Sequence, residues 1–386
     1  MAAINIQFND TGYGADGRCD APIEYRAQVH QGMLALESGF RFYGELKDLA
    51  QTLSKGEGLL AKQKKVSQII EGSKDAPVKT DLEGAYFYSA MDVGQDVNTL
   101  DYLSDKKNIE EIFHAVTLGI KDYFRKMGFT KAILGASGGI DSAVTQVLAV
   151  EALGKENVRA VLMPSQYSSS HSVSDAEQLS RNLGNPYDII PIKNIYESFL
   201  SELKPVFKNL PFGIAEENIQ SRTRGNLLMA IANKFGYILL NTSNKSELAT
   251  GYGTLYGDMA GGLSVLGDLY KTQVYALSRF MNTKNEIIPS NVIIKPPSAE
   301  LRPGQKDSDS LPEYDILDRI LYQYIELRQG PHEIVAKGYD ATLVARVLKL
   351  VNTNEYKRNQ FCPIIRVSCK AFGIGRRLPI VGKYLS

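Results

Sequence analysis

The chain has 386 residues, of which 44% are hydrophobic and 23% are charged, as in an ordinary soluble globular protein. This length makes two domains a reasonable expectation. Lys and Arg number 44 against 43 Asp and Glu, so a net charge of +1 gives no basic field to attract nucleic acid, and we expect no nucleic-acid partner. No apolar run reaches the roughly 18 residues that span a bilayer, and the first residues do not resemble a signal peptide. We therefore expect a cytoplasmic protein that does not bind membranes.

The metal-binding and thiol residues are sparse. Cys19, Cys362 and Cys369 are too few and too scattered for a disulfide framework, which fits a reducing compartment. Neither Cys362 nor Cys369 has a second cysteine pair or a histidine at zinc-site spacing, so idle thiols are the favoured interpretation. The four histidines are dispersed, and no metal or catalytic role is assigned to them: His30, His114, His171 and His332.

Two regions of the chain differ in the pattern of their predicted secondary structure. Residues 1–105 mix Gly-rich turns, a helical-looking stretch and a polar segment, without a regular alternation of strands and helices. A polar run at 104–108 marks the boundary, and we expect an amino-terminal segment at 1–105 and a second domain at 106–386.

From residue 109 the pattern becomes regular. Apolar residues on one face predict a helix within 110–129, and the continuous apolar run 131–136 predicts a strand buried on both sides. Further along, the sequence predicts helices at 141–153, 172–183 and 219–235, and strands at 158–164, 187–192 and 237–242. Strands separated by such helices predict an α/β fold: a doubly wound, mostly parallel sheet of about five strands with helices on both faces. Ligands bind such sheets at the carboxyl ends of the strands.

The rest of the chain is rich in proline from about 285 onward and then turns helical. The segments 315–327 and 341–351 predict helices packed on the sheet domain, and 367–380 predicts an irregular tail.

The sequence Ser137-Gly-Gly-Ile-Asp-Ser142 follows the first strand of this sheet and opens a helix. Backbone N–H groups and the helix dipole at such a position favour an anion, and Gly138 and Gly139 allow close approach of a phosphate. Asp141 beside an anion suggests an intervening Mg²⁺. The plain alternative is a helix start with Ser137 as the N-cap and Asp141 as a first-turn acid. The loop fits neither G-x-G-x-x-G nor Walker A, because no lysine precedes Ser142.

The segment Ser137–Ser142 resembles the pyrophosphatase loop of enzymes that split ATP into AMP and pyrophosphate. Other segments narrow the resemblance to the synthetase domain of NAD synthetases of the long, glutamine-dependent type, from about 109 to the end of the chain. They are LMPS at 162–165, ENIQSRTRG at 217–225, the stretch from 241 to 262 that ends in YGDMAGG, the stretch 295–318 that contains SAELRPGQ, and NEYKRNQ at 354–360.

The resemblance implies a fold like that of the adenine nucleotide alpha hydrolases and a reaction in which ATP adenylates the nicotinate carboxylate of deamido-NAD and ammonia then displaces AMP. It implies ATP-binding residues at Gly135, Ala136, Ser137, Gly138, Gly139, Ile140, Asp141, Ser142 and Thr242. It implies deamido-NAD contacts at Asn218, Glu247 and Lys357, and Arg222 is placed on the helix facing the same crevice. Asp141, Glu247 and Asp258 would lie near Mg²⁺, and Asp141, Lys271 and Ser298 would be catalytic.

The adenylate must be shielded from water, and either the segment 289–312 or the Ser-rich loop 165–172 is a candidate lid. The family associates through its synthetase domain, so the resemblance also implies a homodimer or larger homo-oligomer.

The long type carries a nitrilase-like glutaminase domain, which needs more than the roughly 105 residues that precede the match. Cys19 lies in a turn-like sequence that does not resemble the glutaminase nucleophile, so we expect an idle thiol. Residues 1–105 are interpreted as an incomplete or shortened glutaminase domain, or else as an unrelated docking element. The resemblance therefore implies ammonia as the nitrogen donor, and glutamine if a glutaminase domain is present. The alternatives are another pyrophosphatase-loop enzyme, such as a GMP synthetase-like aminase or a tRNA thiolation enzyme, and a nucleotide-binding module without catalysis.

Overall fold

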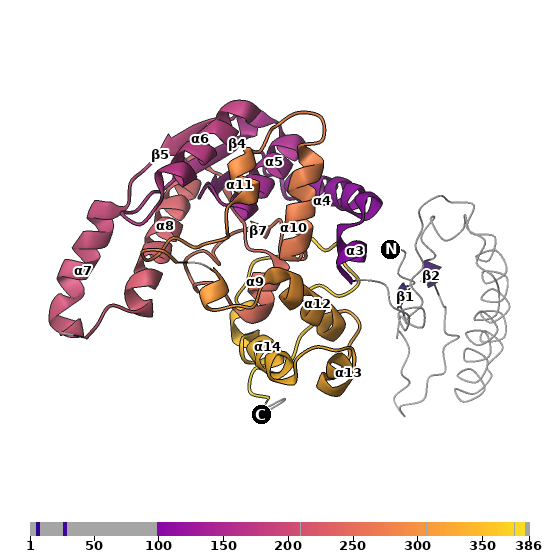
Figure 1. The fold of residues 1–386 in the computed structure, drawn as a ribbon. Coiled ribbons are helices and arrows are strands. Elements are labelled where there is room, and N and C mark those ends of the chain that lie inside the picture. Colours follow the sequence, from indigo (N-terminus) through magenta and orange to yellow (C-terminus); the bar gives the residue numbers. More distant parts are fainter. Residues whose placement is uncertain are drawn as a thin grey trace, which may run out of the picture. The chain divides into compact units, whose positions relative to one another are not determined.

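The structure is a computed structural model, and it describes residues 5–7, 26–28, 99–208, 210–305, 307–373 and 375–382 (Figure 1). The chain divides into two compact units, Met1–Asp92 and Val93–Ser386. In the first unit, β1 (Asn5–Gln7) and β2 (Arg26–Gln28) pair antiparallel. Arg26–Gln28 lie at the start of the helical-looking stretch 25–53 and form a strand, so the helical interpretation is wrong at these residues. The expectations for Cys19, His30 and the rest of this stretch lie outside the described residues.

The second unit is built on a five-stranded sheet in the order β5-β4-β3-β6-β7, in which every pairing is parallel. Its strands are β3 (Ala132–Gly135), β4 (Val158–Leu162), β5 (Tyr187–Ile189), β6 (Ile238–Asn241) and β7 (Leu263–Ser264). The chain moves outward from β3 through β4 to β5, returns to the other side of β3 as β6, and ends at β7. The switch point of the sheet therefore lies between β3 and β6, where ligands bind such folds.

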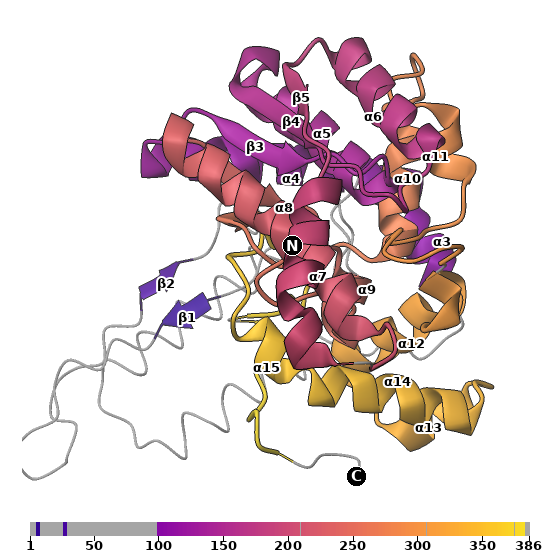
Figure 2. The same cartoon turned by 90° about the vertical axis from the view of Figure 1, so that its left-hand side faces the viewer.

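Helices cover both faces of this sheet, as predicted (Figure 2). The helices of the first face are α4 (Lys106–Met127), α5 (Ile140–Leu153), α6 (Ser170–Leu183) and α10 (Lys271–Met281). The opposite face carries α8 (Ile214–Phe235), with α7 (Lys193–Phe207) packed against it. Successive side chains of β3 point to opposite faces of the sheet and so contact the two helix layers in turn. Leu134 packs with α4 and α5, and Ile133 packs with α8.

The sequence shows why α4 forms where it does. Asp105 caps its first turn by accepting hydrogen bonds from the N–H groups of Lys107 and Asn108 at 3.1 and 3.0 Å. Gly128 ends it in the left-handed region, with φ of 76°. The buried residues recur at spacings of three and four and form one apolar stripe against the sheet: Ile109, Ile112, Val116, Ile120 and Phe124.

A second, smaller core lies beside the sheet layer. It joins α3 (Thr99–Ser104), α9 (Lys245–Thr250), α12 (Tyr314–Ile325), α13 (Pro331–Ala336) and α14 (Ala341–Thr353). The remaining short helices are α11 (Ser290–Ile294) and α15 (Glu355–Arg358). The predicted helices at 315–327 and 341–351 correspond to α12 and α14.

The described part of the tail beyond α15 contains isolated bridges and no longer strand, as predicted, and it folds back on the sheet. Ile364 bridges Ser264 of β7, and the N–H groups of Val367 and Ser368 donate to Asp268.

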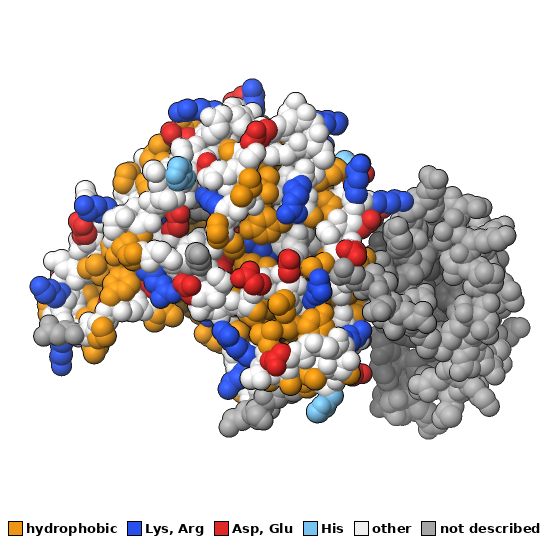
Figure 3. Space-filling view, in the orientation of Figure 1, with side chains coloured by type: hydrophobic (Ala, Val, Ile, Leu, Met, Phe, Trp, Pro, Cys, Tyr) orange, Lys and Arg blue, Asp and Glu red, His pale blue; other side chains and the backbone are white. Residues whose placement is uncertain are grey.

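None of the described helices is long and apolar enough to cross a bilayer. On the face drawn in Figure 3, basic and acidic side chains are interspersed.

Candidate active site

The loop after β3 has the geometry of an anion site at the start of a helix. Gly139 is the N-cap of α5 and has no side-chain cap, so the plain interpretation of Ser137 as the N-cap is wrong. Ser137 Oγ instead accepts from the N–H of Gly139 at 3.1 Å and lies 3.1 Å from Ser142 Oγ. Ser142 Oγ also donates to the carbonyl of Gly139. The two hydroxyls therefore brace the loop from inside, and the loop backbone lines the cavity above it.

The backbone conformation and packing of this loop require glycine at position 138. Its φ is 78°, and a Cβ added there would lie 2.0 Å from the backbone oxygen of Ser172. The loop thus packs directly against the first turn of α6. The two glycines of the motif consequently have different roles: Gly138 permits this contact, whereas Gly139 is an extended N-cap.

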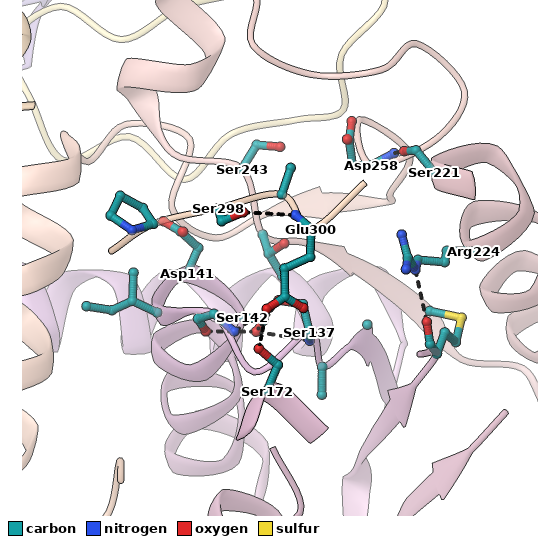
Figure 4. A pocket seen from close by; sticks show the side chains of 18 of the residues that line it. Ser137, Asp141, Ser142, Ser172, Ser221, Arg224, Ser243, Asp258, Ser298 and Glu300 are labelled. Carbon is teal, nitrogen blue, oxygen red and sulfur yellow. Dashed lines mark hydrogen bonds between the residues drawn. The ribbon is translucent and has the colours of Figure 1, made fainter. Parts of the chain in front are cut away.

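A cavity of about 300 Å³ opens over the loop at the carboxyl ends of the strands. Its walls come from the loop, the ends of β4 and β6, one side of α8 and the segment 295–301 (Figure 4). The predicted residues that line it are Gly135, Ala136, Ser137, Gly139, Ile140, Asp141, Ser142, Thr242, Glu247, Asp258, Lys271 and Ser298.

Lys271 joins the two acidic side chains at the centre of the site. Its Nζ lies 2.6 Å from Asp141 Oδ2 and 3.5 Å from Glu247 Oε1, and its side chain is almost fully buried. Asn244, the N-cap of α9, donates its side-chain amide to Asp141 Oδ1 at 2.9 Å and accepts from the N–H of Glu247. The first turns of α5, α9 and α10 therefore converge on one point.

The electrostatics of this cluster follow from burial. Burial raises the pKa of Glu247 to about 8, and the nearby Asp141 carboxylate adds to the rise while Lys271 opposes it. Burial acts to lower the pKa of Lys271, but Asp141 and Glu247 outweigh it and keep this pKa above its usual range. Lys271 is thus a fixed cation beside the loop 137–142.

Residues 295–301 line the cavity, and the segment 295–302 is called the strap. Near its carboxyl end, Glu300 accepts hydrogen bonds from Ser169 Oγ and Ser172 Oγ at 3.0 and 2.8 Å, although its φ of 49° is unfavourable. The carbonyl of the next residue, Leu301, accepts a hydrogen bond from Gln220 of α8. The two segments considered as lids, 289–312 and 165–172, thus meet each other. Ser298 lies in the strap, and its hydroxyl donates to the carbonyl of Gln305 rather than to the cluster at Lys271.

A turn at 251–258 gathers three of the other predicted residues. Asp258 accepts from the N–H of Thr254 at 2.6 Å, and the hydroxyl of Thr254 donates to Asn218. Lys357 donates to the carbonyls of Gly251 and Gly253 at 2.7 and 2.8 Å. Burial raises the pKa of Asp258 and lowers that of Lys357.

Arg222 lines a second, more open hollow of about 310 Å³ on the other side of α8. Phe199, Met229 and Tyr256 give this hollow an apolar wall. Gly225 and Ala260 line both hollows, so they form the partition between them.

Sequence reasoning missed several side chains that line the cavity. Arg224 and Lys295 bring positive charge to it, and Glu300 brings a carboxylate. Asp307 is also there and accepts hydrogen bonds from the hydroxyls of Tyr252 and Tyr314 at 3.2 and 2.9 Å. Asp307 stands in the run KDSDS, which looks like solvated surface, and nothing local in the sequence signals its burial.

The donor set suits Mg²⁺ in part. Mg²⁺ is commonly held by one or two carboxylates together with substrate phosphates. Asp141 and Glu247 supply two such carboxylates next to the loop. Asp258 is bound within its own turn, and the described residues contain no group of three or more His, Cys, Asp or Glu side chains arranged to hold a metal ion.

These features define a doubly wound α/β domain with a glycine-containing loop at the start of a helix and a buried cation at its switch point. Residues 112–361 match the family model described as NAD synthase, and the chain belongs to this family.

The chain is 56% identical over 271 residues to the glutamine-dependent NAD(+) synthetase of Synechocystis, covering 70% of this chain and 49% of that protein. It is 52% identical over 277 residues to the enzyme of the same name from Thermotoga maritima, covering 71% and 48%. The chain thus spans about half the length of the curated relatives it matches.

Two solved structures resemble it over nearly their whole length. The NH3-dependent NAD synthetase from Campylobacter jejuni has 30% identity and a TM-score of 0.53, covering 64% of this chain and 95% of that one. The NMN synthetase from Francisella tularensis has 28% identity and a TM-score of 0.55, covering 65% and 95%.

Proposed function

We propose that this chain amidates deamido-NAD to NAD with ATP, through an adenylated carboxylate, and releases AMP and pyrophosphate. The observation that carries the proposal is the buried Lys271 cation in contact with Asp141 and Glu247, directly beside the phosphate loop. Membership of the NAD synthase family and the names of the relatives support it.

The chemistry explains why these groups belong together. A carboxylate must approach the α-phosphorus of ATP although both are negatively charged, so fixed cations are needed where the charge develops. Lys271 supplies one, and the N–H groups of the loop 137–142 supply partial positive charge at the start of α5. The leaving group is pyrophosphate, and the loop is proposed to hold it together with the rest of the ATP triphosphate.

Mg²⁺ is proposed as the metal ion, held by Asp141 and Glu247. When bound, it would neutralise phosphate charge. Asn244 and Lys271 keep the Asp141 carboxylate turned toward the cavity in this arrangement.

Deamido-NAD is proposed to occupy the second hollow and to pass its nicotinate over the partition of Gly225 and Ala260. Arg222 lies in that hollow, and Asn218, Asp258 and Lys357 hold the adjoining turn at 251–258. ATP and deamido-NAD would then meet at this partition. The adenylate would form there in a fixed position, and the attack of ammonia depends mainly on such positioning. The strap 295–302 is proposed to exclude water from that adenylate.

Ammonia is proposed as the direct nitrogen donor. The curated relatives are named glutamine-dependent, whereas the C. jejuni structure is of an NH3-dependent enzyme. We further propose that the protein is a homo-oligomer and that it works in the cytoplasm.

A second candidate substrate is nicotinate mononucleotide. The likeness to the F. tularensis NMN synthetase favours it, since the same loop and cation would serve a shorter carboxylate substrate.

The test is to incubate the full chain with ATP, Mg²⁺ and either deamido-NAD or nicotinate mononucleotide, with ammonium or glutamine, and to measure AMP and the amidated product. We expect NAD and AMP in equal amounts from deamido-NAD with ammonium. Product from nicotinate mononucleotide alone would replace the first substrate by the second. Absence of AMP under all four conditions would refute the ligase activity. Equal rates with glutamine and ammonium would refute the prediction that the glutaminase domain of this chain is incomplete.

A further inference from the structure

Arg224 is a cation on the inner side of α8 that the proposed reaction has not used. Its Nε donates to the backbone carbonyl of Met163, just beyond β4, at 3.0 Å (Figure 4). This bond fixes the guanidinium against the wall of the main cavity, which Arg224 lines.

Arg224 differs from the other two cations that line the cavity because it has no carboxylate partner among the described residues. Lys271 lies within 4 Å of Asp141 and Glu247, and Lys295 lies 3.4 Å from Asp175. Arg224 has no ion pair within 4 Å among the described residues. Burial lowers the pKa of Arg224 to about 10, with Glu300 and Asp258 acting against this from a distance. A half-buried guanidinium without an ion pair is costly unless a ligand supplies acceptors.

The surroundings of Arg224 indicate which part of a nucleotide would supply them. The cavity wall next to it is apolar and comes from Val161, Met163, Leu228 and Leu239, which pack as one cluster. Phosphate already has its own site at the loop after β3, with Lys271 beside it. An apolar wall beside a planar guanidinium suits an aromatic base, because arginine stacks on such rings and donates to their nitrogens.

We infer that Arg224 is a specificity-determining residue that binds the adenine base of ATP against the wall formed by Val161, Met163, Leu228 and Leu239. This inference rests on the proposed function for its nucleotide, and it assigns the two hollows on α8 to different ligands: Arg224 faces ATP, and Arg222, two residues away, faces deamido-NAD.

The test compares Arg224→Met and Arg224→Lys with Arg222→Met in the full chain. For Arg224→Met we expect the KM for ATP to rise about 10- to 100-fold, with the KM for deamido-NAD and kcat changed less than about threefold. Arg224→Lys keeps the charge but loses the planar fork, and it should restore little of the ATP affinity. Arg222→Met should show the opposite pattern, with the KM for deamido-NAD raised and that for ATP unchanged.

Binding of ATP and of inorganic tripolyphosphate by calorimetry separates base recognition from phosphate recognition and needs no turnover. We expect Arg224→Met to weaken ATP and leave tripolyphosphate unchanged. Equal weakening of both, or a rise confined to the KM for deamido-NAD, would overturn the inference. Normal ATP binding by the wild type without any AMP formation would refute the proposed function alone, and the calorimetric comparison would still decide the role of Arg224. Matching circular dichroism spectra would show that each variant is folded.

Discussion

Lys271 and Asp141 are 130 positions apart in the sequence, and their charged groups lie 2.6 Å from each other. The pair links the first turn of α5 to the first turn of α10. Since Asn244 holds the other oxygen of Asp141, the carboxylate has a fixed orientation toward the cavity. A substitution that removes the charge of Asp141 but keeps the size of its side chain therefore tests the site with little change in shape.

Asp141→Asn should reduce AMP formation by at least about 100-fold, because the fixed charge beside the phosphate loop is lost. The melting temperature should change by only a few degrees, since Lys271 keeps Glu247 as a partner. The measurement is AMP release with saturating ATP and Mg²⁺. Asp122→Asn, on the exposed side of α4, is the matched control and should behave like the wild type. Full activity of Asp141→Asn would remove its proposed role.

Gly138→Ala tests the contact between the loop and α6. The added Cβ would lie 2.0 Å from a backbone oxygen, so the loop must shift and both stability and ATP binding should fall. Gly128→Ala is the control, because Gly128 has nearly the same φ but nothing within 4 Å of the added Cβ. The control should cost about 1–2 kcal/mol from φ alone, and Gly138→Ala should cost clearly more in chemical denaturation. Equal losses would show that the close contact does not matter.

Lys245 is a fully buried cation. Its Nζ lies 2.9 Å from Asp268, 2.8 Å from Glu326 and 2.8 Å from Ser368 Oγ. Lys245→Met would leave two carboxylates buried without their cation, and we expect a loss of about 3–5 kcal/mol in the free energy of unfolding. Lys126→Met, which breaks a surface pair with Asp122, should have little effect. A Lys245 variant as stable as the wild type would contradict this account.

The fully buried Asp318 should make stability depend on pH. It accepts from Ser246 Oγ at 2.5 Å and from the N–H of Thr272 at 2.9 Å, and burial raises its pKa to about 6. A folded-state pKa above the unfolded value of 3.8 means that the folded protein binds more protons between these values. The contribution of Asp318 to stability is therefore greatest below about pH 4 and is lost as the pH rises to about 6.

Asp318→Asn removes this dependence, and a comparison with the wild type cancels the other titrating groups. The stability advantage of the wild type over the variant should shrink by up to about 3 kcal/mol between pH 4 and pH 7, because one pKa unit corresponds to about 1.36 kcal/mol. Urea denaturation at several pH values measures it. An advantage that grows with pH would contradict the raised pKa of Asp318.

Much of the sheet could be predicted from the sequence because its strands are continuous apolar runs. All four strands located by sequence are present, and the predicted edge of the sheet carries the cavity. The fifth strand, β7, has only two residues, so no periodicity could reveal it. The helices α9 and α10 were missed although they carry Glu247 and Lys271: α9 has six residues, and α10 follows a loop rather than a recognisable strand.

The candidate site was predicted from the loop and the resemblance, and its missing parts have a common cause. Arg224, Glu300 and Asp307 reach the cavity only because distant segments fold together, so each looks like a surface charge in its local sequence. Conversely, Asp258 does not lie close enough to Asp141 and Glu247 for the three carboxylates to form a metal-binding group among the described residues. Whether these three share Mg²⁺ with bound substrate stays a prediction.

The tail at 364–369 gives this domain a particular order of assembly. Ser368 bonds to Lys245, and Lys245 is adjacent to Asn244, which orients Asp141. A ribosome delivers the chain from its amino terminus, so the sheet and the phosphate loop can form while synthesis continues. The Lys245–Asp268–Glu326 triad, however, gains its last partner only when Ser368 emerges from the exit tunnel. Maturation of the site therefore waits for a residue that lies 123 positions after Lys245, and a nascent chain stalled before Ser368 should hold its phosphate loop while Lys245 still lacks this partner.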